Sequence, residues 1–169
     1  MSETRTRDAI MNIRIGSGVD THPLVDGRAL TIGGVVVPHD RGLAGHSDAD
    51  VLLHAICDAI LGALALGDLG GHFPATAEWK DADSRALLRH VFALATARGF
   101  TVANADATVI AQAPKLAPYV DVMRANIAAD LECDVAQISV KATSTDRLGF
   151  IGRGEGIACL ATVLLLGAP

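Results

Sequence analysis

Two histidines and one aspartate are the residues of this chain whose types and spacing most strongly suggest chemistry. Asp20 and His22 stand two apart at the end of a segment that reads as a strand, so both side chains project from one face. His54 lies in a long apolar segment that reads as a buried helix. Together they would form a catalytic zinc site with its fourth position open. The alternative is that these are core histidines with satisfied hydrogen bonds.

A polar stripe on the same helix bears on that choice. Asp50, His54 and Asp58 are spaced by four, which places them on one side of an otherwise apolar helix. Burying unpaired charge costs several kcal/mol. The stripe therefore predicts a partner such as a cation or a water-filled cleft, and it strengthens the case for a metal.

The segment from Gly45 to Asp50 lies where this helix should begin. Backbone N–H groups at a helix N-terminus, together with the Ser47 hydroxyl, can cradle a phosphate group. The alternative is a capping box formed by Ser47 and Asp50, which the spacing alone favours. The two interpretations are compatible, because a capping hydroxyl can also contact a ligand.

A third cluster occupies residues 141–147, where an expected strand enters a glycine-rich loop that runs to Gly156. Its hydroxyls and the carboxylate of Asp146 could hold phosphate oxygens and a hard cation such as Mg²⁺. Serine and threonine also occur in loops for their turn chemistry. Arg153 and Glu155 could equally form a surface ion pair of little energetic value.

Strands and helices alternate along the chain. We expect strands over 13–19, 30–37 (two short strands broken by a glycine pair), 100–113, 138–143 and 157–166, and helices over 49–66, 83–99 and 118–131. We expect Ser47 or Asp48 to cap the first helix, and residues 40–45 to form a loop. This order predicts an α+β fold (an α/β sandwich) with one mixed β-sheet covered by helices on one face.

The length of the chain favours one domain. Residues 1–11 are polar without periodicity and are predicted to be a disordered tail, and residues 12–169 a single domain. Half of the residues are hydrophobic but only 4% are aromatic, and the mean hydropathy of +0.36 is high for the surface of a monomer. We therefore expect a subunit interface. The three cysteines, Cys57, Cys133 and Cys159, read as buried reduced thiols.

The charge and hydropathy patterns argue against nucleic acid and membrane partners. The net charge is −5 and the basic residues are scattered, so we expect no nucleic acid partner. No apolar run approaches the ~18 residues of a membrane span, and the start of the chain lacks the apolar region of a signal peptide. We therefore expect a cytoplasmic protein without a membrane partner.

Several long motifs, taken in order, resemble the 2-C-methyl-D-erythritol 2,4-cyclodiphosphate synthase family. They are GSGVDTH (16–22), GHSDADVLLHAICDAILGALALGDLG (45–70), DSRALLR (83–89), AQAPK (111–115) and GFIGRGEGIA (149–158). The resemblance implies a homotrimer with active sites between subunits. It also implies an apolar channel that can hold an isoprenoid diphosphate.

The resemblance further implies a set of site residues. One Zn²⁺ per subunit would be held by Asp20, His22 and His54, and a second divalent cation, Mg²⁺ or Mn²⁺, by Asp146. His46 and Ser144 would be catalytic. The implied substrate contacts are Ser47, Asp68, Leu69, Gly70, Phe73, Ala111, Ala113, Pro114, Lys115, Leu116, Ala117, Thr143, Thr145, Phe150 and Arg153.

The family's reaction makes the chain a metal-dependent, cyclising phosphorus–oxygen lyase of the non-mevalonate isoprenoid pathway. The substrate is a cytidine diphosphate derivative, 4-diphosphocytidyl-2-C-methyl-D-erythritol 2-phosphate, and the products are the 2,4-cyclodiphosphate and CMP. The chain departs from the family pattern at Ser144 (threonine), at Asp146 (glutamate) and over 73–77, which reads FPATA for FPDTD in a region one residue shorter. Two alternatives are a catalytically weakened paralogue that binds isoprenoid diphosphates and a metal-dependent cytidine-nucleotide phosphohydrolase.

Overall fold

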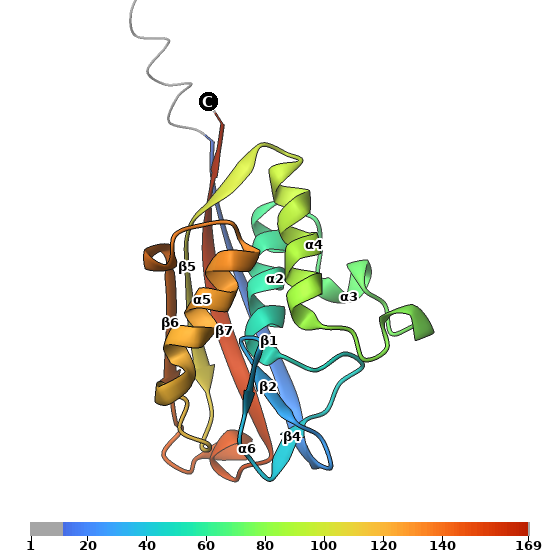
Figure 1. Ribbon diagram of the computed structural model, residues 1–169, viewed down its shortest axis with the longest axis vertical. Helices are drawn as coiled ribbons and strands as arrows, with labels where there is room; N and C mark the ends of the chain where they lie inside the picture. The colour runs from blue at the N-terminus through green and yellow to red at the C-terminus, as the bar shows by residue number, and fades with distance from the viewer. Residues whose placement is uncertain (1–11, 169) are drawn as a thin grey trace, which may run out of the picture.

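A five-stranded mixed sheet forms the centre of the computed structural model, which describes residues 12–168; the predicted tail 1–11 lies outside the described residues (Figure 1). Its strand order is β4-β1-β7-β5-β6. The strands are β1 (Ile13–Asp26), β4 (Arg41–Leu43), β5 (Phe100–Ile110), β6 (Ile138–Thr143) and β7 (Gly156–Gly167). Only β5 and β6 pair in parallel, whereas the other neighbours are antiparallel. The predicted α+β class and mixed sheet are confirmed.

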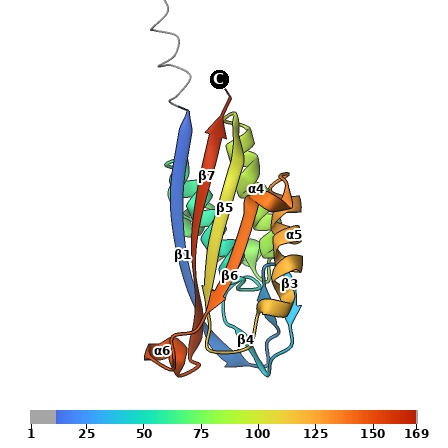
Figure 2. The same cartoon turned by 90° about the vertical axis from the view of Figure 1, so that its left-hand side faces the viewer.

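Three longer helices cover one face of this sheet: α2 (Val51–Ala63), α4 (Ser84–Thr96) and α5 (Val120–Asp130). Figure 2 looks onto the opposite face, where the strands stand in front of the helices. Helix α2 lies in the core, and all of its residues except Asp58 and Gly62 are buried. Two short helices, α3 (Leu69–His72) and α6 (Gly149–Gly152), and 3-10 turns at 77–79, 117–119 and 135–137 complete the helical elements. No helix among the described residues is both long and apolar enough to cross a membrane.

The predicted pair of short strands forms a separate hairpin of β2 (Leu30–Ile32) and β3 (Val35–Val37). Gly33 and Gly34 make its two-residue turn with φ angles of 61° and 69°. Both angles lie in the left-handed region that glycine adopts without a steric penalty. The turn packs against the start of α2, where the side chain of Asp50 accepts hydrogen bonds from both glycine N–H groups.

Strand β1 and helix α2 approach each other very closely because β1 carries glycines where they meet. A Cβ atom at Gly16 would lie 1.9 Å from the carbonyl oxygen of Ala59, and one at Gly18 would lie 2.1 Å from that of Ala55. No side chain fits at such distances. The two glycines therefore let the helix that carries His54 lie directly on the strand that carries Asp20.

Several predicted boundaries are wrong. β1 does not stop at Val19 but continues to Asp26, since β7 pairs with it as far as Pro23 and β4 pairs with it beyond. Residues 41–43 form strand β4 and not a loop, and α6 lies within the predicted glycine-rich loop. β5 ends at Ile110, three residues early.

The predicted N-cap of α2 is also wrong. Asp50 caps this helix in place of Ser47 or Asp48, because its carboxylate accepts from the N–H groups of Leu52 and Leu53.

The three cysteines are free thiols, as predicted. Cys57 and Cys159 are buried as predicted, whereas Cys133 is only half-buried.

Candidate metal centre

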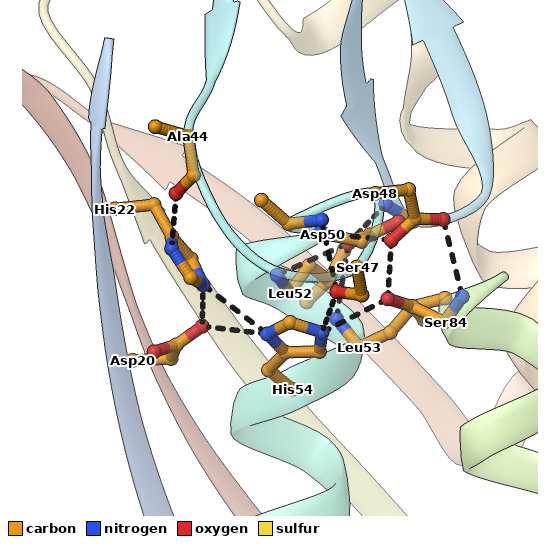
Figure 3. Close-up of polar contacts among 12 residues, drawn as sticks. Asp20, His22, Ala44, Ser47, Asp48, Asp50, Leu52, Leu53, His54 and Ser84 are labelled. Carbon is orange, nitrogen blue, oxygen red and sulfur yellow. Dashed lines mark hydrogen bonds and ion pairs between the residues drawn. The ribbon is translucent and has the colours of Figure 1, made fainter. Parts of the chain in front are cut away.

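Asp20, His22 and His54 meet at one point, as their spacing predicts (Figure 3). The Asp20 Oδ2 atom lies 2.9 Å from His22 Nε2 and 3.0 Å from His54 Nδ1. The two ring nitrogens lie 3.2 Å apart. Three potential ligand atoms within 4.8 Å of one another can hold a metal ion.

Two elements position these side chains. Asp20 and His22 project from the same face of β1, which is held in register by its pairing with β7. His54 belongs to the first turn of α2, and its backbone N–H donates to the carbonyl of Asp50. The cluster thus lies between a strand and a helix that both belong to the core.

A backbone carbonyl orients the ring of His22. Its Nδ1 lies 2.8 Å from the carbonyl oxygen of Ala44. A carbonyl oxygen can only accept, so Nδ1 carries the proton. In the neutral ring the lone pair is then on Nε2, the atom that faces Asp20 and His54.

The electrostatics of the cluster favour a positive charge at its centre. Burial alone would raise the pKa of Asp20, but hydrogen bonds and charge from His22 and His54 outweigh it and lower that pKa well below its usual range. Burial alone would lower the pKa of His22, yet Asp20 raises it above 6.5. A proton can supply this charge, and a metal ion would compete with it for the same atoms.

The three members of the polar stripe, Asp50, His54 and Asp58, lie in different environments. His54 belongs to the cluster described above. The carboxylate of Asp50 is fully buried and faces the hairpin turn and its own helix, where backbone N–H groups satisfy it. The prediction that it needs a cation or a cleft is therefore wrong for Asp50, and the capping box with Ser47 does not form. Asp58 accepts from the N–H of Leu69 at 2.7 Å and lines the pocket beside the cluster.

This pocket has a volume of about 500 Å³. It brings together nine of the residues predicted for the site: Asp20, His22, His46, Ser47, His54, Asp68, Leu69, Gly70 and Phe73. Asp58, which the polar stripe predicts to face a cation or a cleft, also lines this pocket, whereas sequence reasoning missed Trp79 and Leu87. Trp79 joins the pocket through an edge-to-face contact with Phe73, with the ring centroids 4.8 Å apart, which no sequence pattern indicates.

Backbone contacts hold the segment that carries His46 and Ser47. The guanidinium of Arg28 donates to the carbonyl oxygens of Gly45 and Ser47 at 2.9 and 2.6 Å. His46 Nε2 lies 2.5 Å from the carbonyl oxygen of Thr76. Asp50 occupies the N–H groups of Leu52 and Leu53, so these two groups do not contribute to the predicted phosphate cradle, and the side chains of His46 and Ser47 are polar groups of this rim.

The remaining predicted residues lie away from this pocket. Residues 111–117 follow β5, and residues 143–146 lie at or after the end of β6. Both segments are toward the opposite edge of the sheet from β1 and β4. There the Ser144 hydroxyl lies 3.3 Å from the carboxylate of Asp146, which is exposed. Phe150 lies in α6, and Arg153 forms an exposed ion pair with Glu155 at 2.6 Å.

A carboxylate and two imidazoles beside an open pocket are typical of catalytic metal sites, whereas structural sites are closed by a fourth protein ligand. The fold and the cluster thus define a candidate metalloenzyme. The chain belongs to the YgbB family, whose model matches residues 13–166.

Individual relatives agree with this assignment. A Geobacter metallireducens protein named 2-C-methyl-D-erythritol 2,4-cyclodiphosphate synthase is 64% identical over 154 residues, which are 90% of this chain and 98% of the relative. The bifunctional IspDF from Campylobacter jejuni matches with a TM-score of 0.89 and 44% identity over 92% of this chain and 42% of that chain. A Plasmodium falciparum structure described as a CDP complex matches with a TM-score of 0.83 and 36% identity over 94% of this chain and 98% of that one.

Proposed function

We propose that the chain converts 4-diphosphocytidyl-2-C-methyl-D-erythritol 2-phosphate to 2-C-methyl-D-erythritol 2,4-cyclodiphosphate and CMP, in the non-mevalonate pathway. The convergence of Asp20, His22 and His54 at the pocket carries this proposal. The names of the curated relatives and the CDP in a neighbouring structure support it. A cytoplasmic location stays a prediction.

The ion that we propose for the cluster is Zn²⁺, one per subunit. The donor set fits it, because two neutral ring nitrogens and one carboxylate form the ligand set of many catalytic zinc sites. When bound, the ion would supply positive charge and an open coordination position for the diphosphate of the substrate. The residues around it then have to hold the substrate in line for the attack of its 2-phosphate.

The pocket side of the site offers groups for the phosphates and the erythritol. His46 and Ser47 line its rim, and we assign them to the phosphates, with His46 stabilising charge that develops in the transition state. Asp68, with Leu69, Gly70 and Phe73, would hold the methylerythritol. The altered loop 73–77 supplies no carboxylate, but Asp58 and Asp68 both line the pocket and can accept hydrogen bonds from hydroxyl groups.

We assign the nucleotide to the segment that follows β5. Residues 111–117 would hold the cytosine, partly through backbone groups, with the side chains or backbone of Ala111, Ala113, Pro114, Lys115, Leu116 and Ala117. The loop after β6 would hold the diphosphate through Thr143, Ser144 and Thr145, and a second divalent cation, Mg²⁺ or Mn²⁺, through Asp146. Asp146 and Arg147 have φ angles of 51° and 67°, a conformation uncommon for such residues and often associated with functional loops.

These two groups of residues lie toward opposite edges of the sheet in one chain, which supports sites shared between subunits, and the family resemblance implies that the subunits number three. In a head-to-tail ring, the β6 edge of one subunit would face the β1 edge of the next and complete its site. The face of the sheet without helices exposes Ile15, Val19 and Leu160. We propose that this apolar face lines the threefold axis, where a channel with Phe150 and Arg153 at its end could hold an isoprenoid diphosphate.

Neither alternative function gains support from the site. A weakened paralogue would be free to lose ligands or catalytic groups, yet all three ligands and His46 lie around one pocket. A phosphohydrolase would need an attacking water, for which the open position of the proposed metal ion would also serve, so the site does not favour it over the cyclising reaction and the products decide between the two.

Phosphorus NMR of the reaction tests the proposal directly. The protein would be incubated with the substrate, Zn²⁺ and Mg²⁺. We expect the resonances of a cyclic diphosphate to appear together with CMP in equal amounts. CMP without a cyclic product would indicate the phosphohydrolase, and an unchanged substrate would indicate the paralogue; either result overturns the proposal.

A further inference from the structure

The ring of His54 has a second polar edge that faces away from the metal-ligand cluster. Its Nδ1 lies beside Asp20, whereas its Nε2 lies 2.9 Å from the hydroxyl oxygen of Ser84 and 3.2 Å from that of Ser47 (Figure 3). Ser84 is the first residue of α4 and is fully buried. A buried imidazole nitrogen needs a hydrogen-bond partner, so these hydroxyls determine which tautomer of the ring is stable.

The hydroxyl proton of Ser84 is already committed to a carboxylate. The Ser84 hydroxyl donates a short hydrogen bond to Oδ1 of Asp48, and the Ser84 N–H donates to Oδ2 of the same carboxylate at 3.1 Å. An ionised carboxylate can only accept. The Ser84 oxygen therefore acts as an acceptor toward His54, which favours the proton on Nε2, and the Ser47 oxygen can accept the same proton. The lone pair of the neutral ring is then on Nδ1, which faces Asp20 and His22.

We propose that Asp48 and Ser84 are positioning residues that prepare His54 to bind the metal ion. The hydrogen-bond chain from Asp48 through Ser84 fixes the tautomer and the orientation of the His54 ring. Neither residue lines the pocket, so both act through His54. The inference rests on the proposed metal site and assigns to it two side chains that act behind a ligand. Partners of this kind typically change metal affinity 10- to 100-fold.

Asp48→Ala gives the sharpest test, because it removes the acceptor of the Ser84 hydroxyl proton. The Ser84 hydroxyl would then be free to donate to Nε2 of His54, and the ring proton would move to Nδ1, where Asp20 can accept it. We expect zinc affinity, measured by competition with a chromogenic chelator, to fall about 10- to 100-fold. We also expect ¹⁵N NMR of the metal-free protein at mildly alkaline pH to show the His54 proton on Nε2 in the wild type and on Nδ1 in the variant.

Two further variants make the test specific. Ser84→Ala removes the acceptor and should weaken zinc binding to a similar extent; it carries the test if Asp48→Ala does not fold. The double variant should bind no more weakly than Asp48→Ala alone, since both residues act through one chain of hydrogen bonds. Asp83→Ala is the matched control, because Asp83 caps α4 through the N–H of Arg85 and should leave zinc affinity unchanged.

Wild-type zinc affinity in both folded single variants would overturn the proposal, and so would a His54 proton that stays on Nε2 in Asp48→Ala. These outcomes leave the proposed reaction untouched, because that reaction is judged by the products of the wild-type protein. A wild-type protein that binds zinc but forms no cyclic product would refute the proposed function and still leave the effect of Asp48 on His54 measurable.

Discussion

Asp20, His22 and His54 bring acceptor atoms so close together that their mutual repulsion has to be offset by a positive charge. Two ring nitrogens lie 3.2 Å apart, and each lies within 3.0 Å of a carboxylate oxygen. Such a group is unfavourable in a partly buried place unless a proton or a metal ion lies between its members. The side-chain geometry therefore favours a positive charge at this point, a proton or a metal ion, independently of the family likeness.

Replacing one ligand should remove the ion. We expect His54→Ala to lose tightly bound zinc and turnover while it keeps its secondary structure, because the ring contributes one ligand atom of three. Metal analysis after gel filtration and circular dichroism would measure both properties. His39→Ala is the matched control, since His39 contacts Asp40 and does not line the pocket. Full activity of a metal-free His54→Ala protein would contradict the assignment of the site.

The pKa of His22 predicts the pH dependence of metal binding. Although burial works to lower this pKa, the hydrogen bond and charge of Asp20 raise it above 6.5. A proton therefore competes for Nε2 at a higher pH than in an ordinary histidine. Zinc affinity should be constant in mildly alkaline solution and fall by about tenfold per pH unit below the raised pKa. An affinity measured by calorimetry that stayed constant to well below pH 6.5 would contradict this.

At the scale of single residues, the sequence predicted the three side chains of the cluster but not the residues that contact His54 from behind. Asp20 and His22 are two apart on a strand, and His54 interrupts an apolar helix, so both signals are local. Ser84 meets His54 only because the start of α4 packs against the start of α2, which is a contact between residues 30 apart. No local pattern indicates such a contact.

The element that matters most for the site is the pair of β1 and α2. Gly18 faces the helix so closely that a Cβ atom there would lie 2.1 Å from the carbonyl oxygen of Ala55. The strand can therefore hold Asp20 within reach of His54 only while this position has no side chain.

Gly18→Ala should consequently lower both stability and metal affinity, because the helix has to move away from the strand. We expect a loss of about 1 to 3 kcal/mol in the free energy of unfolding, measured by urea denaturation. Gly62→Ala is the matched control within α2: its Cβ atom would lie 3.8 Å from the nearest atom, and alanine favours a helix by about 0.5 to 1 kcal/mol. A Gly18→Ala protein as stable as the wild type would contradict the close packing described here.

Elements with a strong local pattern were predictable, and those that depend on distant pairing were not. The apolar helix α2, the β-branched strand β5 and the apolar strand β7 followed from periodicity and composition. Strand β4 has only three residues with a central glycine and forms because β1 extends to pair with it. The cap of α2 was misassigned because Ser47, Asp48 and Asp50 are all good capping residues, and the hairpin turn at Gly33 selects Asp50.

On the scale of the whole molecule, one chain provides the pocket toward one edge of its sheet and the expected nucleotide segment toward the other edge. The sequence motifs indicated both halves but not their separation, since sheet order depends on which distant strands pair. A ring of three subunits would unite the halves, as we propose.

Complementation between two inactive variants tests this arrangement. His54→Ala removes the pocket side of the site, and Asp146→Ala removes the loop side. If each site combines neighbouring subunits, unfolding and refolding an equal mixture should restore about a quarter of wild-type activity, because one site in four pairs an intact pocket with an intact loop. Successive purification through a different affinity tag on each variant would establish that mixed trimers have formed. Mixed trimers without activity would contradict a site shared between subunits.

X-ray diffraction from zinc-loaded crystals, measured on both sides of the zinc absorption edge, tests the central claim most directly. The account predicts one anomalous peak per chain about 2.0 to 2.2 Å from Asp20 Oδ2, His22 Nε2 and His54 Nδ1, with a side open to the pocket. A peak elsewhere, or zinc bound through Nε2 of His54, would contradict it.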